Sequence, residues 1–522
     1  MARWREEQRM YRVWSLQYGR TAIMQNMKFT IVSTMILLAG LCFSALSTAA
    51  ETYDSQATIK IGSLIEPQNL DNTAGAGQGI NEAFNGNVYQ ALFLLTDKGT
   101  VEKQLATDYH ISDDGLEYRF TLRPDVHFHS GKVMTSADVK FSIERVIASD
   151  SKSSRKNSLK TIAGIETPDA NTVVVRLSSR SVSLPYNLSY VWIVNDQATN
   201  LTTREDGTGP YQLQNWRRGS SLSLQRFDRY WGERPANAGV IFQYFTDASA
   251  LNNALLTNAV DLITSVQSPD SLAQFKNNPA FTVSEGQSTT KLLLAYNDNV
   301  VPFNNVDVRR AMTQAIDKRK LLQSIWGNYG TLIGSFVPPS DPWYVDLNNV
   351  NAYNPENAKA LLAKAGYPNG FSFTLDTPNY DPHPIVAQFV QNELKKVGIT
   401  VKINVITANE WYTKIYKAHN FQATLQEHVN HRDIVFYGDP NFYWGYDNPQ
   451  VTALIKEAEL ASSEADQTRA LAEANRIIAE DAASSWLYLY PQIVVSVKTV
   501  SGYPVNALNA QFFVWNIKKN KI

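Results

Sequence analysis

Three side chains that can bind a metal occur close together, at His428, His431 and Asp433. Imidazole and carboxylate groups bind divalent transition metals, and this spacing could bring all three to one ion. No second pair of strong donors is nearby, and neutral imidazoles beside a cleft often bond only to water or backbone. Two interpretations stay open: a metal site at these residues, or no bound metal or other cofactor.

The sequence contains little that indicates catalysis. Ser153 and Lys156 have the spacing of a Ser-x-x-Lys nucleophile motif, but they lie in the basic, polar run 151–160, which is typical of an exposed loop. A zinc signature, a P-loop and a Gly-x-Ser-x-Gly elbow are all missing from the sequence. We therefore expect no catalytic residues and no enzymatic activity.

The composition indicates a folded chain with more than one domain. It has 522 residues, of which 44% are hydrophobic and 19% charged, enough to bury several cores. The net charge is −1, so no excess of basic residues attracts nucleic acid or an anionic lipid surface. Nucleic acid is not an expected partner.

The N-terminal region is typical of an exported protein. An apolar run, 31–46, follows Lys28 and precedes four small residues, 47–50, that are suited to cleavage after Ala50. The run is shorter than the roughly 20 residues of a membrane span. We interpret 27–50 as a cleaved signal peptide.

Two features of this region could suggest other interpretations. Cys42 is the only cysteine, but it follows Leu41 where a lipid-anchor signal needs a small residue, so an ordinary signal is favoured. The arginine-rich stretch 1–26 is long for a leader, and translation could begin at Met24 or Met27 instead. We treat 1–26 as a mis-assigned extension.

Local patterns predict the elements that must position any site. Period-two alternation predicts strands at 57–64, 118–122, 172–177, 221–226 and 291–296.

Helix signals dominate the later half of the chain. Asn354-Pro355 and Asn448-Pro449 each predict a capped helix start, and Thr135 and Asp138 form a capping box. A helical stripe at 386–394 runs directly into a strand at 401–405. This alternation of helices and strands favours an α/β fold.

Ordered motifs along the mature chain carry a family resemblance. They include 118–123 (YRFTLR), 126–131 (VHFHSG), 207–211 (GTGPY), 230–232 (YWG), 308–311 (VRRA) and 353–355 (YNP). By order and spacing the chain resembles the bacterial extracellular solute-binding proteins of family 5, the peptide-, nickel- and opine-binding components of ABC importers. By their own chemistry these motifs are mostly structural, such as the tight turn at Gly209-Pro210.

The resemblance implies a two-lobed periplasmic-binding-protein fold of type II, with an extra subdomain in the larger lobe. Lobe I is expected to comprise 51–95, 206–300 and 492–522, the extra subdomain 96–205, and lobe II 301–491. A monomer would enclose a small peptide or similar solute between its lobes and deliver it to the permease subunits at the inner membrane. The alternatives are a nickel or metal chelate, an opine or a sugar, and, more remotely, a secreted hydrolase.

The resemblance also implies ligand contacts in the smaller lobe. A peptide cleft must pair a buried ammonium group with an acid, and Asp433 follows the aromatic pair Trp411-Tyr412 as that acid does in the peptide-binding relatives. Arg432 is expected to bind an anionic group. Both residues could instead be solvated surface charges.

Further contacts are expected on both sides of the cleft. The segment after Asp433 is short compared with the usual family pattern and is rich in aromatic residues, including Tyr437 and Tyr443. In the larger lobe, the loop after Leu70-Asp71 would line the ligand, because glycines such as Gly75 and Gly77 let backbone approach closely. Asn87 and Tyr89, together with Trp411 and Tyr412 of the smaller lobe, complete the predicted set of ligand contacts.

Overall fold

The computed structural model describes residues 53–75, 77–266 and 269–521. The predicted signal peptide and N-terminal extension lie outside the described residues. Within these ranges, no helix is both long and apolar enough to cross a membrane.

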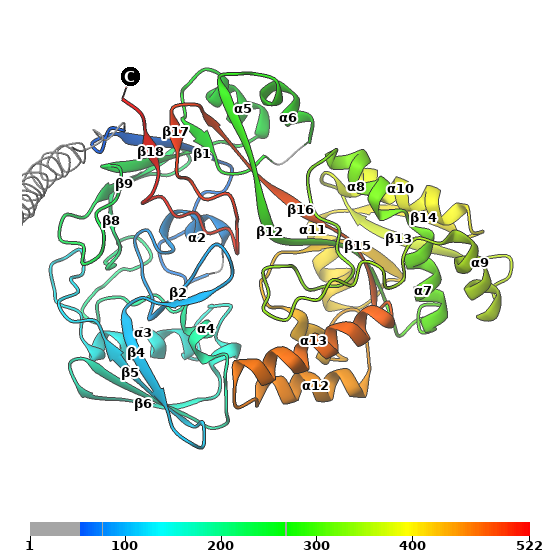
Figure 1. Cartoon of the computed structure of the whole chain (residues 1–522), viewed down its shortest axis with the longest axis horizontal. Helices are drawn as coiled ribbons and strands as arrows, with labels where there is room; N and C mark the ends of the chain where they lie inside the picture. The colour runs from blue at the N-terminus through cyan, green and yellow to red at the C-terminus, as the bar shows by residue number, and fades with distance from the viewer. Residues whose placement is uncertain (1–52, 76, 267–268, 522) are drawn as a thin grey trace, which may run out of the picture. The chain divides into compact units, whose positions relative to one another are not determined.

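A ten-stranded mixed sheet forms the main framework (Figure 1). In sheet order its strands are β14 (Thr400–Ile406), β13 (Ser372–Pro378), β15 (Ala423–His428), β12 (Phe281–Tyr296), β16 (Ser484–Val497), β11 (Leu262–Ile263), β1 (Thr58–Ser63), β10 (Gly239–Tyr244), β9 (Ser221–Arg226) and β8 (Tyr211–Arg217). Strand β1 runs parallel to β10 and β11, and β13 runs parallel to β14 and β15. The remaining pairs in the sheet are antiparallel.

Strands β12 and β16 join the two halves of this sheet. In Figure 1 they run from the half with β1 and β8–β10 to the half with β13–β15. Their register shifts between Gln287 and Lys291, so the regular pairing is interrupted over 288–290. The two halves of the sheet are therefore joined by paired strands with an irregularity in the middle.

The C-terminal end of β12, residues 292–296, is buried on both faces of the sheet. Leu292, Leu294 and Tyr296 enter a core with helices α7 (Val306–Ala315), α8 (Lys318–Trp326), α9 (Pro355–Lys364) and α10 (His383–Lys395). Leu293 and Ala295 point to the other face, into a core with α12 (Pro449–Glu459) and α13 (Glu464–Glu480). Alternation with a period of two supplies both cores from one strand.

A separate four-stranded sheet with its own core lies within the range predicted as an extra subdomain. Its order is β4 (Ala106–Ile111), β5 (Glu117–Leu122), β7 (Thr172–Leu177) and β6 (Ile162–Asp169), and α3 (Ser136–Ile147) packs against β6 and β7. The other elements are α2 (Gln78–Phe84), β2 (Phe93–Leu95), β3 (Val101–Lys103), η1 (Asn157–Leu159), α4 (Leu184–Leu188), α5 (Ala248–Leu256), α6 (Pro269–Lys276), α11 (Ala408–Glu410), η2 (Trp411–Lys417), η3 (Ile434–Gly438), β17 (Val500–Ser501) and β18 (Lys518–Lys519).

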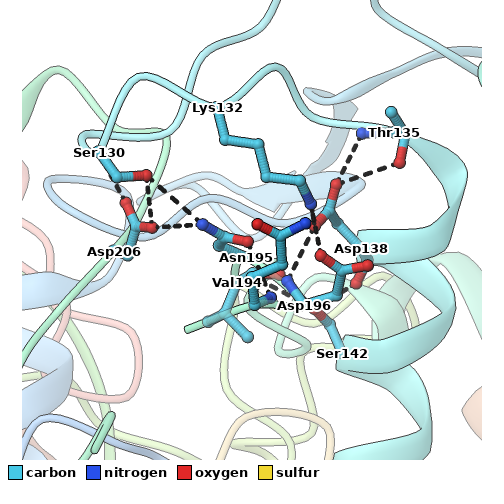
Figure 2. Close-up of polar contacts among 10 residues, drawn as sticks. Ser130, Lys132, Thr135, Asp138, Ser142, Val194, Asn195, Asp196 and Asp206 are labelled. Carbon is cyan, nitrogen blue, oxygen red and sulfur yellow. Dashed lines mark hydrogen bonds and ion pairs between the residues drawn. The ribbon is translucent and has the colours of Figure 1, made fainter. Parts of the chain in front are cut away.

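A polar network explains the motif that precedes α3 (Figure 2). The predicted capping box is present, since Asp138 accepts a 2.8 Å hydrogen bond from the Thr135 amide. Lys132 bridges Asp138 and Asp196, and the Asp196 amide also donates to Asp138 at 2.9 Å. The Ser130 hydroxyl of this motif donates to the Asp206 carboxylate at 2.7 Å. The motif therefore anchors the segment 194–206, which confirms its predicted structural role.

Candidate functional site

A cavity of about 530 Å³ lies beside the irregular part of β12. This volume is within the range of about 300–1,000 Å³ that is usual for small-molecule sites. Its walls come from both halves of the ten-stranded sheet and from loops that follow it. The lining falls mainly in the segments 63–65, 72–85, 153–155, 190–192, 264–266, 288–290, 380–381, 427–430, 490–492 and 507–512.

The predicted glycine loop forms one wall of the cavity. Gly75 and Gly77 both line it, and a side chain at Gly77 would meet nothing within 4 Å. Asp71 holds the base of the loop through an ion pair of 2.5 Å with Arg145. The amide of Lys152 donates to the Thr73 carbonyl at 2.9 Å, which ties this loop to the segment 153–155.

Asn87 and Tyr89 are buried behind the lining. The Asn87 side chain donates to the Phe512 carbonyl at 2.8 Å and accepts from the Val514 amide at 3.0 Å. Tyr89 stacks on Trp192 with ring centroids 4.9 Å apart. Since Phe512 and Trp192 line the cavity, the two predicted residues support the wall from behind.

The structure places Asp433 in a buried ion pair away from the lining. Its carboxylate lies 2.7 Å from the Lys291 ammonium group, and both side chains are buried. Burial raises the pKa of Asp433 to about 6, against the opposing charge of Lys291, so the carboxylate stays ionised at neutral pH. The predicted ammonium anchor therefore already has a cation.

Arg432 also has a partner within the protein. Its guanidinium group lies over the Tyr186 ring, 4.1 Å from the centroid, and donates weakly to the Gly99 carbonyl at 3.4 Å. Arg432 is absent from the cavity lining.

The four predicted aromatic contacts lie outside the cavity, on η2 and in the segment that follows β15. Trp411 is buried and donates to Thr424 at 3.1 Å, whereas Tyr412 is 47% exposed. Tyr437 donates to Ser484 at 3.0 Å, and Tyr443 packs among buried aromatic rings. None of the four lines the cavity.

The structure does not assemble the alternative metal set. His428 bonds to the Tyr443 hydroxyl at 3.0 Å, while His431 pairs with Asp341 at 2.9 Å. Burial and then the Lys291 charge lower the pKa of His428 to about 3, which keeps the ring neutral. Over the described ranges, no group of three or more His, Cys, Asp or Glu residues is placed to hold a metal ion.

The Ser-x-x-Lys pair is also kept apart. The Lys156 ammonium group donates to the Ser149 carbonyl at 2.6 Å, and the Ser153 hydroxyl accepts from the Arg155 amide at 3.2 Å. The lysine is thus engaged with backbone instead of activating the serine.

Several lining residues were missed by the sequence interpretation. Arg155, Tyr190, Trp192, Glu82 and Glu427 all line the cavity. The run 151–160 was assigned to an exposed loop because it is polar, and Glu427 gave no signal within its strand. A lone arginine among serines near the glycine loop could be recognised only once the two loops were known to meet.

Glu82 is buried in the cavity wall with a partner of its own. The Ser63 hydroxyl donates to its carboxylate at 2.6 Å. Burial raises the pKa of Glu82 to about 7, so this side chain is partly protonated at neutral pH.

His383 supports the lining at Tyr380 and Asp381, and it makes stability depend on pH. Burial lowers its pKa to about 4, compared with about 6.5 in an unfolded chain. As the pH falls from 6.5 towards 4, the unfolded chain binds a proton that the folded chain does not. The free energy of unfolding should then decrease, by up to about 1.4 kcal/mol per pH unit. Above pH 6.5 this contribution is fully present.

Urea unfolding between pH 4.5 and 7.5 measures this dependence. The variant His383→Gln should show a shallower slope than the wild type, and the same substitution at the exposed His110 serves as the control. An unchanged slope in His383→Gln would contradict the assignment.

Comparison with known proteins finds solute-binding proteins both among family profiles and among individual sequences. The profile of the bacterial extracellular solute-binding proteins, family 5 Middle, matches residues 100–430. The glutathione-binding protein GsiB of Salmonella paratyphi A is 29% identical over 350 residues, covering 64% of this chain and 67% of its own.

Solved structures show the same fold. DppA from Helicobacter pylori, in complex with the peptide STSA, superposes with a TM-score of 0.72 at 22% identity, over 90% of this chain and 99% of its own. The binding protein AgaA from A. tumefacien R10, in complex with agropinic acid, has a TM-score of 0.72 at 26% identity, over 89% and 99%. These likenesses confirm the predicted periplasmic-binding-protein fold of type II.

Proposed function

This chain belongs to the bacterial extracellular solute-binding proteins of family 5, and from that premise we propose that it captures a small peptide or peptide-like solute for an ABC importer. The observation that carries the proposal is the cavity of about 530 Å³ with walls from both halves of the ten-stranded sheet. A solute bound there would contact both halves and favour the arrangement in which they enclose it.

The names of relatives support a peptide-like ligand. GsiB is a glutathione-binding protein, and DppA was solved with a four-residue peptide. Glutathione is itself a modified tripeptide. We therefore take glutathione and simple tripeptides as the first solutes to test.

The finer features of the protein are part of the same proposal. We infer that it acts in the periplasm after removal of a signal peptide, as a monomer, and that it catalyses no reaction. Lobe I would comprise 51–95, 206–300 and 492–522, with 96–205 as its extra subdomain and 301–491 as lobe II. Permease subunits at the inner membrane would receive the solute.

Thermal unfolding of the protein with candidate solutes tests this function. A solute that binds only the folded state should stabilise it by about 2.7 kcal/mol when present at one hundred times its Kd, which raises Tm. Glutathione, Ala-Ala-Ala, agropinic acid and the nickel–histidine complex form the panel, and each mixture is analysed by mass spectrometry for conversion. A raised Tm with glutathione or Ala-Ala-Ala and no conversion is expected. No shift with either peptide, or turnover of either, would overturn the proposal.

A further inference from the structure

The cavity contains a cation that no acid in the described part of the chain neutralises. Arg155 lines the cavity with its guanidinium group over the Tyr190 ring, 3.4 Å from the centroid. Among the described residues, no carboxylate forms an ion pair with it. Tyr190 is itself fixed, since Asn72 donates to its carbonyl at 3.3 Å and Asn509 to its hydroxyl at 2.5 Å. Arg155 is therefore held in place by neutral tyrosine side chains, and none of the described carboxylates balances its charge.

An unpaired acid lines the same cavity from a different wall. Glu427 is on β15, paired opposite Leu292 of β12, and is only partly exposed. No lysine, arginine or histidine in the described ranges forms an ion pair with it. Burial raises the pKa of its carboxyl group, and the neighbouring Tyr490 hydroxyl opposes this shift only in part.

The other acids in the lining differ from Glu427 in their exposure. Glu82 is buried and accepts from Ser63, and Asp381 is exposed to solvent, whereas Glu427 is partly exposed. Arg155 is the one lysine or arginine among the described lining residues. A solute that fills the cavity must therefore bring its own positive charge to satisfy Glu427.

From this pairing we propose that Arg155 binds a carboxylate of the solute and Glu427 binds an ammonium group of the same molecule, so that the cavity selects zwitterions. An ion left unpaired in a closed cavity costs several kcal/mol, so a solute that lacks either charge would be disfavoured. The inference rests on the proposed function, because it assigns the contacts within the same cavity. It also replaces Asp433, whose charge is taken by Lys291, as the ammonium anchor.

Isothermal titration calorimetry with altered solutes and altered protein tests both contacts. The probes are glutathione and Ala-Ala-Ala, each also as its N-acetyl derivative and its C-terminal amide. Wild-type protein should bind either derivative about ten- to one-hundred-fold more weakly than the parent peptide, because a charged hydrogen bond is lost. In Arg155→Met the amide should bind about as well as the parent, and in Glu427→Gln the same should hold for the acetyl derivative.

Matched controls separate these effects from general damage. Lys156→Met removes the neighbouring charge outside the lining, and Glu457→Gln removes an exposed acid on α12, so both should behave as wild type. Each variant is also checked by circular dichroism. The parent peptides could bind while the amide still binds more weakly than the parent in Arg155→Met, and the acetyl derivative still binds more weakly in Glu427→Gln. In that case the inference is wrong while the proposed function stands. If neither parent peptide binds wild-type protein, the proposed function itself fails.

Discussion

Replacing Lys291 by methionine should lower the free energy of unfolding by about 3–5 kcal/mol, because Asp433 would become a buried carboxylate without its cation. Both partners of this ion pair are buried, at 0% and 3% side-chain exposure. Lys291 also donates to the Asn430 carbonyl at 2.8 Å and lies over the Phe336 ring. Asn430 lines the cavity, so the substitution should weaken peptide binding as well.

Urea unfolding of three variants separates the ion pair from the loss of packing. The double variant Lys291→Met with Asp433→Leu removes both charges and should recover part of the stability, since a buried pair can be replaced by apolar groups. Lys359→Met removes an exposed lysine whose partner is Glu356, and should cost less than about 1 kcal/mol. If Lys291→Met costs no more than Lys359→Met, the pair does not stabilise the fold as argued.

Elements with local signals were predicted well from the sequence. The Asn-Pro pairs at 354–355 and 448–449 do cap α9 and α12, with each asparagine side chain accepting from backbone amides of the first turn. The helix and strand predicted at 386–394 and 401–405 correspond to α10 and β14. These signals act over a few residues, so they can be read without knowing the tertiary structure.

The charges of the site were harder to predict, because their partners are distant in sequence. Asp433 and Lys291 are 142 residues apart, and nothing near Asp433 shows that its charge is already balanced. The polar sequence around Arg155 is typical of a solvated loop. In the structure, Arg155 packs on Tyr190, and the Lys152 amide donates to Thr73 of the glycine loop. Gly75 and Gly77 do line the cavity, but a Cβ at Gly77 would meet nothing within 4 Å, so close packing within the protein does not account for this glycine.

The role of Gly286 could not be predicted from the sequence either, because it depends on a segment distant along the chain. Its substitution is expected to have the second large effect on stability and binding. Gly286 lies in the middle of β12, with no motif around it, yet a Cβ there would stand 2.0 Å from the Val505 carbonyl oxygen. The chain at 505–507 is bound to β12 by hydrogen bonds, including Ala507 amide to Gln287 carbonyl at 3.0 Å and Gln287 amide to Asn506 at 2.8 Å. Only a glycine lets these two backbones lie so close.

Gly286→Ala should therefore push the segment 505–507 away from β12. The free energy of unfolding should fall by about 3 kcal/mol, the upper part of the range for overpacking. Glutathione binding should weaken about tenfold, equivalent to about 1.4 kcal/mol, because Ala507 and Asn509 of the displaced chain line the cavity.

Urea unfolding and calorimetry measure the two consequences of Gly286→Ala separately. Gly164→Ala is the matched control: a Cβ on this β6 glycine meets nothing within 4 Å, so stability should change by less than about 0.5 kcal/mol. A loss of stability with unchanged binding would mean that the C-terminal wall holds its place independently of β12. Equal stability in both variants would mean that the backbones separate without cost, and the close approach would then have no role in the fold.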